Sequence, residues 1–179
     1  MKKILLISDT HGYIDDKILS YCKLADEVWH AGDIGSIEVV DKIKQLKPFK
    51  GVYGNIDNNL IRNKFPIDQR FSCENIKVWI THIGGYPSRY SKRISDRLKS
   101  EKVDLFICGH SHILRVMNDK KHDLLYINPG AIGKHGFHNK RTMVRFEIDG
   151  KKIENLEIIA VSYTHLRAHE TPEHLVWRV

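Results

Sequence analysis

The first third of the chain alternates short apolar runs with segments of helical length, and this alternation constrains the fold more than any other feature. Residues 4–7 are continuously apolar, which is typical of a strand buried on both faces. Residues 27–30 and 51–53 are predicted to be further strands. Asp15 and Ser36 are typical helix N-caps and predict helices from 15 to about 23 and from 36 to Pro48. This β-α-β-α-β succession implies parallel strands joined by right-handed crossovers.

The second half of the chain contains more strands than helices. A hairpin is predicted over 70–73 and 77–81, a helix over 91–102, and strands over 105–108, 113–117, 124–127, 142–148 and 152–159. Asp149-Gly150 between the last two strands is a strong signal for a tight hairpin turn. The predicted fold class is therefore α/β, with two facing mixed β-sheets in a β-sandwich flanked by helices.

The length of 179 residues corresponds to one domain, which we place at residues 1–160. Residues 161–179 show neither helical nor strand periodicity and resemble translated adapter sequence. They are predicted to be a non-native or disordered C-terminal tail whose removal leaves activity and stability nearly unchanged. The histidines of this tail are excluded from the candidate site: His165, His169 and His174.

Composition narrows the class of protein. With 41% hydrophobic and 28% charged residues, the chain is typical of a soluble globular protein. It has no apolar run of membrane-spanning length, and its apolar start stops at Asp9, so neither a membrane span nor a targeting segment is expected. Three widely separated cysteines exclude a disulfide framework and a thiolate zinc cluster, and they favour a cytoplasmic location.

The net charge is +7, and because the charges of the tail cancel, it belongs to residues 1–160. Such a charge suits anionic partners, but on charge alone a solvated surface is the favoured explanation. No arginine-rich tract or RNA-binding signature is present, so nucleic acid is not an expected partner. A nuclease or nucleic-acid binder is the alternative, and a steep loss of affinity with salt would reveal it.

Polar side chains follow the predicted strands at the point where each strand ends. In α/β sheets, ligands bind outside the carboxyl ends of the strands, where loops from several strands converge. Several carboxylate, imidazole and amide side chains at one sheet edge would repel one another or lack hydrogen-bond partners, unless they bound shared cations. Two divalent metal ions would do so, with these residues as candidate ligands: Asp9, His11, Asp33, Asn55, His82, His110 and His112.

The types of donor narrow the chemistry. Carboxylate, imidazole and amide donors without thiolate suit Mn²⁺, Fe²⁺, Co²⁺, Ni²⁺ or Zn²⁺. Because Asp9 and Asp33 supply only two negative charges, two such ions would keep a positive surplus, which favours a phosphate ester as the guest. The ions would also lower the pKa of water toward ~7 and so provide a hydroxide nucleophile at neutral pH.

Taken singly, each motif has a simpler explanation. Asp9-Thr10-His11 and Gly32-Asp33 are typical of turns, and Asn55 tolerates the left-handed backbone of a loop. His82 can be a hydrogen-bonded loop histidine. The alternating histidines of Gly109-His110-Ser111-His112 are the most indicative single motif. The five motifs together, each after its own strand, favour one shared site.

These motifs resemble the signature of the calcineurin-like metallophosphoesterase superfamily. The small size and the motifs around His30, Tyr53 and Asn128 are similar to its small single-domain bacterial and archaeal phosphodiesterase branch. The resemblance implies a two-sheet sandwich with a dinuclear site, manganese or nickel as the usual activating ions and diesters as the usual test substrates. It also implies that the first metal is held by Asp9, His11, Asp33 and His112, that Asp33 bridges, and that the second metal is held by Asn55, His82 and His110.

The chain departs from many members of the superfamily at Ile56, where they carry a histidine that acts as an acid or binds phosphate. The leaving group must then be a good one or take its proton elsewhere. His135 and His138 are candidates, with exposed loop histidines as the simpler explanation. His30 is expected either to orient the Asp33 loop or only to pack at a strand end. Two further residues are expected to support loops: Asp57 by bonding backbone amides, and Asn128 as a turn residue before Pro129.

We therefore predict a metal-dependent phosphoesterase, and more specifically a phosphodiesterase. It is expected to hydrolyse a small phosphate ester with a hydroxide that bridges two divalent metals. Asp33, Asn55 and His110 are the predicted catalytic residues. Manganese is the first expectation, with nickel, iron, cobalt or zinc as alternatives. A non-catalytic scaffold similar to the retromer subunit is the alternative from another class, and the complete set of ligands weighs against it. The sequence leaves open whether the protein forms a homodimer.

Overall fold

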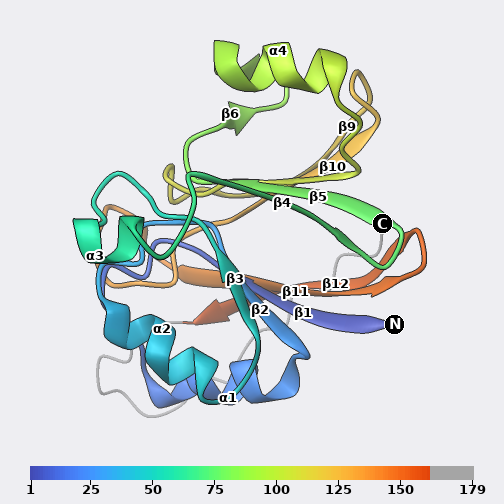
Figure 1. Cartoon of the computed structure of the whole chain (residues 1–179). Helices are drawn as coiled ribbons and strands as arrows, with labels where there is room; N and C mark the ends of the chain where they lie inside the picture. Colours follow the sequence, from blue (N-terminus) through green and yellow to red (C-terminus); the bar gives the residue numbers. More distant parts are fainter. Residues whose placement is uncertain (162–179) are drawn as a thin grey trace.

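Two five-stranded mixed sheets face each other in the computed structural model, which describes residues 1–161 (Figure 1). In both sheets the strands are listed in their order across the sheet. Sheet A consists of β12 (Lys152–Val161), β11 (Arg141–Asp149), β1 (Lys2–Ile7), β2 (Glu27–His30) and β3 (Phe49–Gly51). Sheet B consists of β4 (Asp68–Cys73), β5 (Ile76–Thr81), β8 (Leu105–Ile107), β10 (Leu124–Pro129) and β9 (Leu114–Asp119). The predicted fold class is confirmed.

The apolar run of β1 explains why the molecule has several layers. Successive side chains of a strand point to opposite faces. Ile4 and Leu6 pack in the core between the two sheets, whereas Leu5 and Ile7 pack in a second core on the outer face of sheet A. Each of these four side chains is buried, so the outer face must be covered as well.

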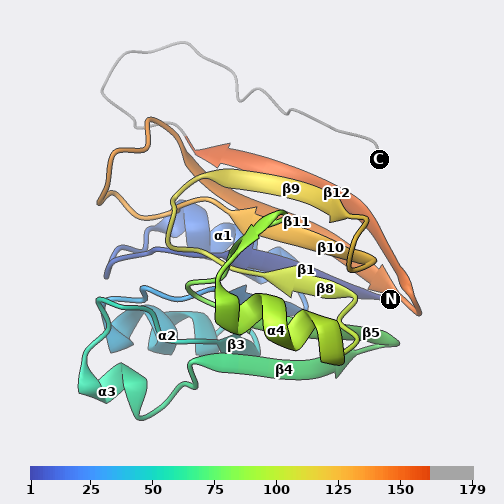
Figure 2. The ribbon, with the colours of Figure 1, turned by 90° about the horizontal axis from the view of Figure 1, so that it is seen from above.

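Helices cover the outer faces of both sheets. In Figure 1, α1 (Asp16–Leu24) and α2 (Ile37–Lys44) lie below sheet A, and α4 (Lys92–Ser100) lies above sheet B. Figure 2, seen from above, shows α4 lying over sheet B. Asp15 and Ser36 cap α1 and α2 by accepting from the amides of Ile18 and Glu38, so the predicted helix starts are confirmed.

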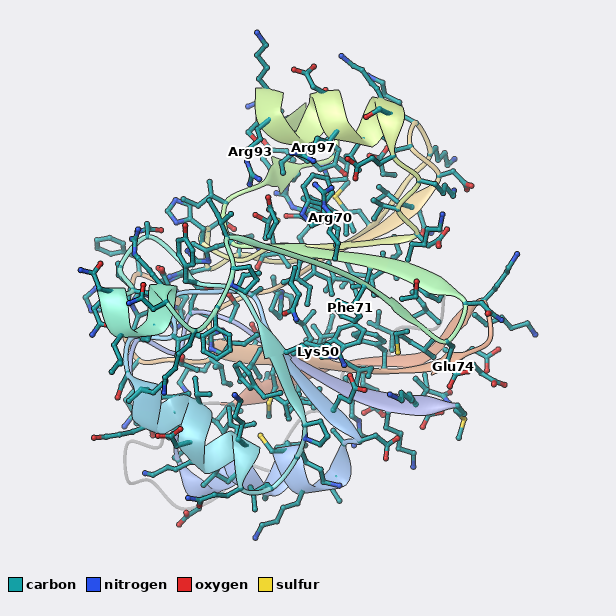
Figure 3. All side chains as sticks on the ribbon, in the orientation of Figure 1. Lys50, Arg70, Phe71, Glu74, Arg93 and Arg97 are labelled. Carbon is teal, nitrogen blue, oxygen red and sulfur yellow. The ribbon has the colours of Figure 1, made fainter. Side chains whose placement is uncertain are left out.

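Charged side chains connect α4 to the edge of sheet B. Glu101, which follows the helix, accepts from Arg70 of β4 and from Arg97 of α4. Arg93 donates to Asp68 of β4, and Figure 3 shows the arginines Arg70, Arg93 and Arg97 in this region. Because these pairs are partly exposed, they orient the helix more than they stabilise the fold.

The main differences from the predicted elements lie around the third strand and the chain end. The third strand was predicted at 51–53 but spans Phe49–Gly51, because the backbone amide of Tyr53 already bonds to the carbonyl of Pro66 instead of β2. Short elements were not predicted: α3 (Asn59–Arg62), β6 (Gly85–Tyr86) and β7 (Arg89–Tyr90).

Strand β12 continues one residue past the predicted domain end at 160. Val161 is buried and pairs with Arg141 of β11, so it belongs to sheet A. The rest of the predicted tail, residues 162–179, lies outside the described residues. Within residues 1–161, no helix combines the length and apolar character needed to cross a membrane.

Candidate metal centre

The candidate ligands gather where the parallel strands of both sheets end. Strands β1, β2 and β3 of sheet A run parallel to one another, as do β5 and β8 of sheet B. Their carboxyl ends lie at the end of the sandwich that carries α3, away from the N-terminus (Figure 1). The loops that follow these strands carry all seven predicted side chains: Asp9 and His11 after β1, Asp33 after β2, Asn55 after β3, His82 after β5, and His110 and His112 after β8.

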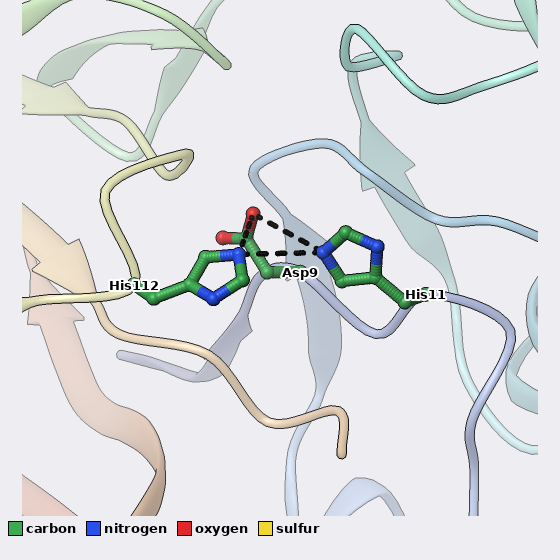
Figure 4. Close-up of side chains that lie close together, drawn as sticks. All are labelled: Asp9, His11 and His112. Atoms are coloured by element: carbon green, nitrogen blue, oxygen red, sulfur yellow. Dashed lines mark hydrogen bonds and ion pairs between the residues drawn. The ribbon is translucent and has the colours of Figure 1, made fainter. Parts of the chain in front are cut away.

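Three of these side chains form a first group of potential metal ligands: Asp9, His11 and His112. Asp9 Oδ1 lies 3.2 Å from His112 Nε2 and 4.0 Å from His11 Nε2. The two Nε2 atoms lie 3.3 Å apart (Figure 4). Three donor atoms from two distant parts of the chain therefore point at one small volume.

A second group of potential ligands consists of Asp33, His82 and His110. Asp33 Oδ1 lies 3.2 Å from His82 Nε2, and Asn55 Oδ1 lies 3.1 Å from the same nitrogen. The rings of His82 and His110 lie edge to face with centroids 5.2 Å apart. Asn55 thus joins this group through its amide oxygen.

The two groups adjoin each other. Asp33 Oδ2 lies 3.8 Å from His11 Nε2 of the first group, and Asp9 Oδ1 lies 4.0 Å from His82 Nε2 of the second. Each buried carboxylate therefore faces histidines of both groups. This arrangement fits Asp33 as a ligand shared between two ions.

The donor atoms face one another in a way that calls for a cation. His82 Nδ1 lies 2.8 Å from the carbonyl of Ala31, which only accepts, so Nδ1 carries a proton. In the neutral ring, Nε2 then presents its lone pair to the oxygens of Asp33 and Asn55. Among the described residues, Asp9 Oδ1 is buried without accepting a hydrogen bond. Either protons or metal ions must occupy these points, and the set of O and N donors fits divalent transition metals.

Burial and charge oppose each other at the histidines. Burial lowers the pKa of His11 more than the Asp33 and Asp9 carboxylates raise it. Burial also lowers the pKa of His82, but the hydrogen bond with Asp33 and the two carboxylates raise it further, so the net shift is upward. The Asp9 carboxylate, whose Oδ1 lies 3.2 Å from His112 Nε2, raises the pKa of His112. The same negative field that retains protons here would attract a metal cation.

Five of the seven candidate ligands have a left-handed backbone, which non-glycine residues rarely adopt. They are Asp9, His11, Asp33, His110 and His112, with φ between 47° and 67°. Only a surrounding structure that fixes the loops can maintain such conformations. Gly54 makes room for the Asp33 loop in this packing, because a Cβ there would lie 2.0 Å from Asp33 Oδ1.

His30 and Asp57 fix the ligand loops through hydrogen bonds. Thr10 donates its hydroxyl proton to the carbonyl of Ile34, so His30 Nε2 donates to Thr10, while His30 Nδ1 accepts from the amide of Gly32. His30 thus orients the Asp33 loop, which was one of the two expectations. Asp57 bonds loop amides as expected, and its partners are the amides of Ile34, Gly35 and Gly54.

Two more side chains fix the loops that carry Asn55 and His110. Asn128 Nδ2 donates to the carbonyl of Gly109, which precedes His110. Arg62 was not singled out from the sequence, yet it donates to the carbonyls of residues 54, 55 and 57 and stacks on Tyr53. A lone arginine gives no sequence signal for this role, because all its hydrogen-bond acceptors are backbone oxygens.

The remaining histidines predicted as alternatives lie in the loop before β11. The ring of His135 is exposed and lies 5.0 Å from that of His11, and His138 lies 5.3 Å from His112. Both therefore flank the first group. Ile56 is exposed beside Asn55, so the position of the usual histidine offers no proton here.

A match to a family model over most of the chain identifies the family to which it belongs. A model of the calcineurin-like phosphoesterase superfamily domain matches residues 1–151. The chain belongs to this family. The resemblance predicted from the motifs is confirmed, and membership supports a phosphoric ester hydrolase in general.

Curated relatives agree with this assignment. A probable metallophosphoesterase of Methanothermobacter thermautotrophicus is 26% identical over 156 residues, which covers 83% of this chain and 87% of the relative. A probable metallophosphoesterase of Mycoplasma pneumoniae is 33% identical over 138 residues, covering 74% and 80% of the two chains.

Solved structures share the fold at lower identity. Vps29 of Entamoeba histolytica, solved with Zn²⁺, has a TM-score of 0.73 at 17% identity and covers 97% of this chain and 98% of its own. The phosphoesterase Yfce of E. coli has a TM-score of 0.61 at 18% identity and covers 89% and 92% of the two chains. At such identities these likenesses establish the fold alone.

Proposed function

We propose that this member of the family is a phosphodiesterase with a centre for two divalent metal ions. The observation that carries the proposal is the pair of adjoining donor groups, in which the buried Asp33 faces histidines of both groups. The first ion would be held by Asp9, His11, Asp33 and His112, and the second by Asp33, Asn55, His82 and His110. Manganese is the first expectation for the metal, and Ni, Fe, Co or Zn are the alternatives.

When bound, the two ions would supply an activated water nucleophile and positive charge for the phosphoryl oxygens. The chain contributes the arrangement around them. Asp9 and Asp33 are buried and hold position, whereas Asn55 and His110 are exposed and can reach the phosphoryl group of a bound ester. The Asn55 amide donates to a phosphoryl oxygen, and its carbonyl side faces His82.

Apolar side chains next to the centre favour a diester over a monoester. Ile56, Ile83 and Ile113 directly follow Asn55, His82 and His112, and all three are exposed. A diester carries one negative charge and a second organic group, so it loses less hydration beside these side chains than a dianionic monoester does. Because Ile56 offers no proton, a good leaving group is expected to react fastest.

Replacing the shared carboxylate tests the proposal. Asp33→Asn is expected to lower kcat/KM for bis(p-nitrophenyl) phosphate at least about a hundredfold and to reduce bound metal. The matched control is Asp41→Asn, which changes an exposed carboxylate on α2 and is expected to keep full activity. Circular dichroism checks that both variants fold. Normal turnover by Asp33→Asn would contradict the proposal.

A non-catalytic scaffold is the second candidate, because Vps29 structures are among those that share the fold. It predicts no hydrolysis of any ester across a panel of metals. The set of donor side chains weighs against it, since all seven candidate positions carry groups able to bind a divalent ion. The panel of metals and of mono- and diesters therefore decides between the two candidates.

A further inference from the structure

A small cavity adjoins the candidate centre on the side of His110. Its volume is about 250 Å³, and it lies between the loops after β5 and β8, strand β6 and the start of β9. Its lining includes the candidate ligand His110 itself, so a molecule whose phosphoryl group lies at the centre can extend an attached group into this cavity. Its lining also includes the side chains of Ile83, Tyr86, Ile113 and Arg115.

Two apolar side chains form the rim of this cavity. The exposed fractions of Ile83 and Ile113 are 46% and 57%. Each follows a candidate ligand directly, so the backbone that fixes His82 and His112 also fixes the position of the rim. An apolar group placed between the two would remove both side chains from water, which is favourable by the hydrophobic effect.

Arg115 and Tyr86 form a flat, positively charged wall. The guanidinium carbon of Arg115 lies 4.1 Å from the centroid of the Tyr86 ring. Within residues 1–161, Arg115 forms no ion pair with a carboxylate, so its charge remains available beside the centre. A planar pair of this kind packs well against another ring, and its charge complements an anionic phosphoryl group.

We infer that this cavity binds an aromatic ester group of the phosphoryl substrate. The inference rests on the proposed function, because it assigns the place of one organic group of the diester. The volume is below the roughly 300–1,000 Å³ of sites for drug-sized ligands, which matches a single ring and not a whole substrate. Gly84 and Gly85 line the cavity with backbone atoms only.

A second cavity, beside Asn55 and His82, shares Ile83 with the first and is less suited to an aromatic group. It is lined by Arg62 and Arg93, which already donate to loop carbonyls and to Asp68 and Thr81. Ile67 on its rim has an exposed fraction of 51%, close to that of Ile113. Ile113 lines only the first cavity and Ile67 only the second, so the two residues provide a matched pair for a test.

The test compares phenylphosphonate with methylphosphonate as inhibitors of bis(p-nitrophenyl) phosphate hydrolysis by the manganese-loaded chain. A phosphonate keeps its organic group on a P–C bond that hydrolysis does not cleave. Phenylphosphonate is expected to bind about tenfold more tightly, because it buries a ring between two isoleucines. Ile113→Ala is expected to reduce this preference to about threefold or less, whereas Ile67→Ala leaves it unchanged.

Methyl NMR supplies a readout that does not depend on turnover. On titration of the chain loaded with diamagnetic Zn²⁺, the δ1 methyl signal of Ile113 is expected to shift with phenylphosphonate and that of Ile67 to stay. Equal inhibition by the two phosphonates, or an equal effect of Ile113→Ala and Ile67→Ala, would overturn the inference alone. Absence of hydrolysis would overturn the proposed function, and the NMR titration would then still decide whether the cavity accepts an aryl group.

Discussion

Asp57 illustrates how one side chain fixes two ligand loops. Its carboxylate is buried and accepts from the amides of Ile34, Gly35 and Gly54, at 3.1, 2.6 and 2.8 Å. Two of these amides follow Asp33, and the third precedes Asn55. The strained left-handed backbone of Asp33 is therefore held by acceptors that a neutral side chain cannot replace in full.

Asp57→Asn is expected to lower the free energy of unfolding by about 2 kcal/mol, because its NH₂ group would face an amide donor in a buried position. Urea unfolding of the metal-free protein measures this. Asp41→Asn on the exposed face of α2 is the control and is expected to change little. Equal stabilities of the two variants would contradict the role assigned to Asp57.

Glu27 links three neighbouring strands of sheet A and should give the protein a measurable acid sensitivity. Burial alone would raise the pKa of this carboxyl, but hydrogen bonds from Lys2, Lys50 and Trp29 outweigh it and lower the pKa to about 2 from an ordinary value of 4.5. The folded state thus binds this proton less readily than the unfolded chain. The stabilisation is present above about pH 4.5 and is lost as the pH falls toward 2.

Between about pH 6 and pH 3, Glu27 is therefore expected to account for a loss of about 2 kcal/mol in the free energy of unfolding. Glu27→Gln should be less stable at about pH 6 and should lose correspondingly less on acidification. Urea unfolding of both metal-free proteins at the two pH values measures the difference. Identical pH dependence of the two proteins would show that Glu27 titrates normally.

At the scale of elements, the two sheet-A helices begin with caps of different strength. Ser36 caps α2 by accepting one amide hydrogen bond. Asp15 caps α1 and also accepts from Arg141 Nη2 at 2.9 Å and from the hydroxyl of Tyr13. Because Arg141 is only 3% exposed, loss of Asp15 leaves a buried charge without its carboxylate.

Asp15→Ala is accordingly expected to cost about 2–3 kcal/mol of unfolding free energy, against about 1 kcal/mol for Ser36→Ala. Thermal and urea unfolding of the two variants measure this. Similar costs would mean that Arg141 finds other partners once Asp15 is removed. A larger cost for Ser36→Ala would contradict the comparison outright.

The elements also show where prediction from the sequence reaches its limit. Caps and the turn at Asp149-Gly150 are local chemistry, so α1, the start of α2 and the β11–β12 hairpin were predicted close to their observed bounds. The end of α2 was not, because the helix stops at Lys44, before the predicted stop at Pro48. Periodicity reports burial, not hydrogen-bond partners, so the end of β3 and the order of strands within each sheet were not predicted. The short α3 depends on a cap at Asn58 within a polar loop and gave no periodic signal.

The candidate ligands were predictable as a set because each follows an apolar strand. The left-handed backbones of five of them were not, since Asp and His adopt that conformation more often than most residues, yet only in a minority of cases. The role of Arg62 also escaped prediction, because it depends on carbonyls that only the folded loop brings together.

At the scale of the whole molecule, the candidate centre joins the two sheets. Asp9, His11, Asp33 and Asn55 follow strands of sheet A, whereas the other three ligands follow strands of sheet B. Ions bound here would connect the two halves of the sandwich in the folded state only. Metal binding is therefore coupled to folding of the entire sandwich.

Addition of Mn²⁺ at about a hundredfold excess over its Kd is expected to stabilise the folded chain by about 2.7 kcal/mol for each site and to raise the Tm by several degrees. Asp33→Asn should lose most of this rise, and Asp41→Asn should keep it. Thermal scans with and without chelator measure the effect. A metal-induced rise of equal size in both variants would place the bound ion elsewhere.

The number of metal ions that the folded chain binds tests the proposed two-metal centre most directly. Elemental analysis of the purified protein, after loading with manganese and removal of unbound metal, gives this number. Two ions per chain are expected for the wild-type protein, with a marked loss in Asp33→Asn. A chain that remains folded and retains no divalent metal under any loading condition would contradict the proposed metal centre.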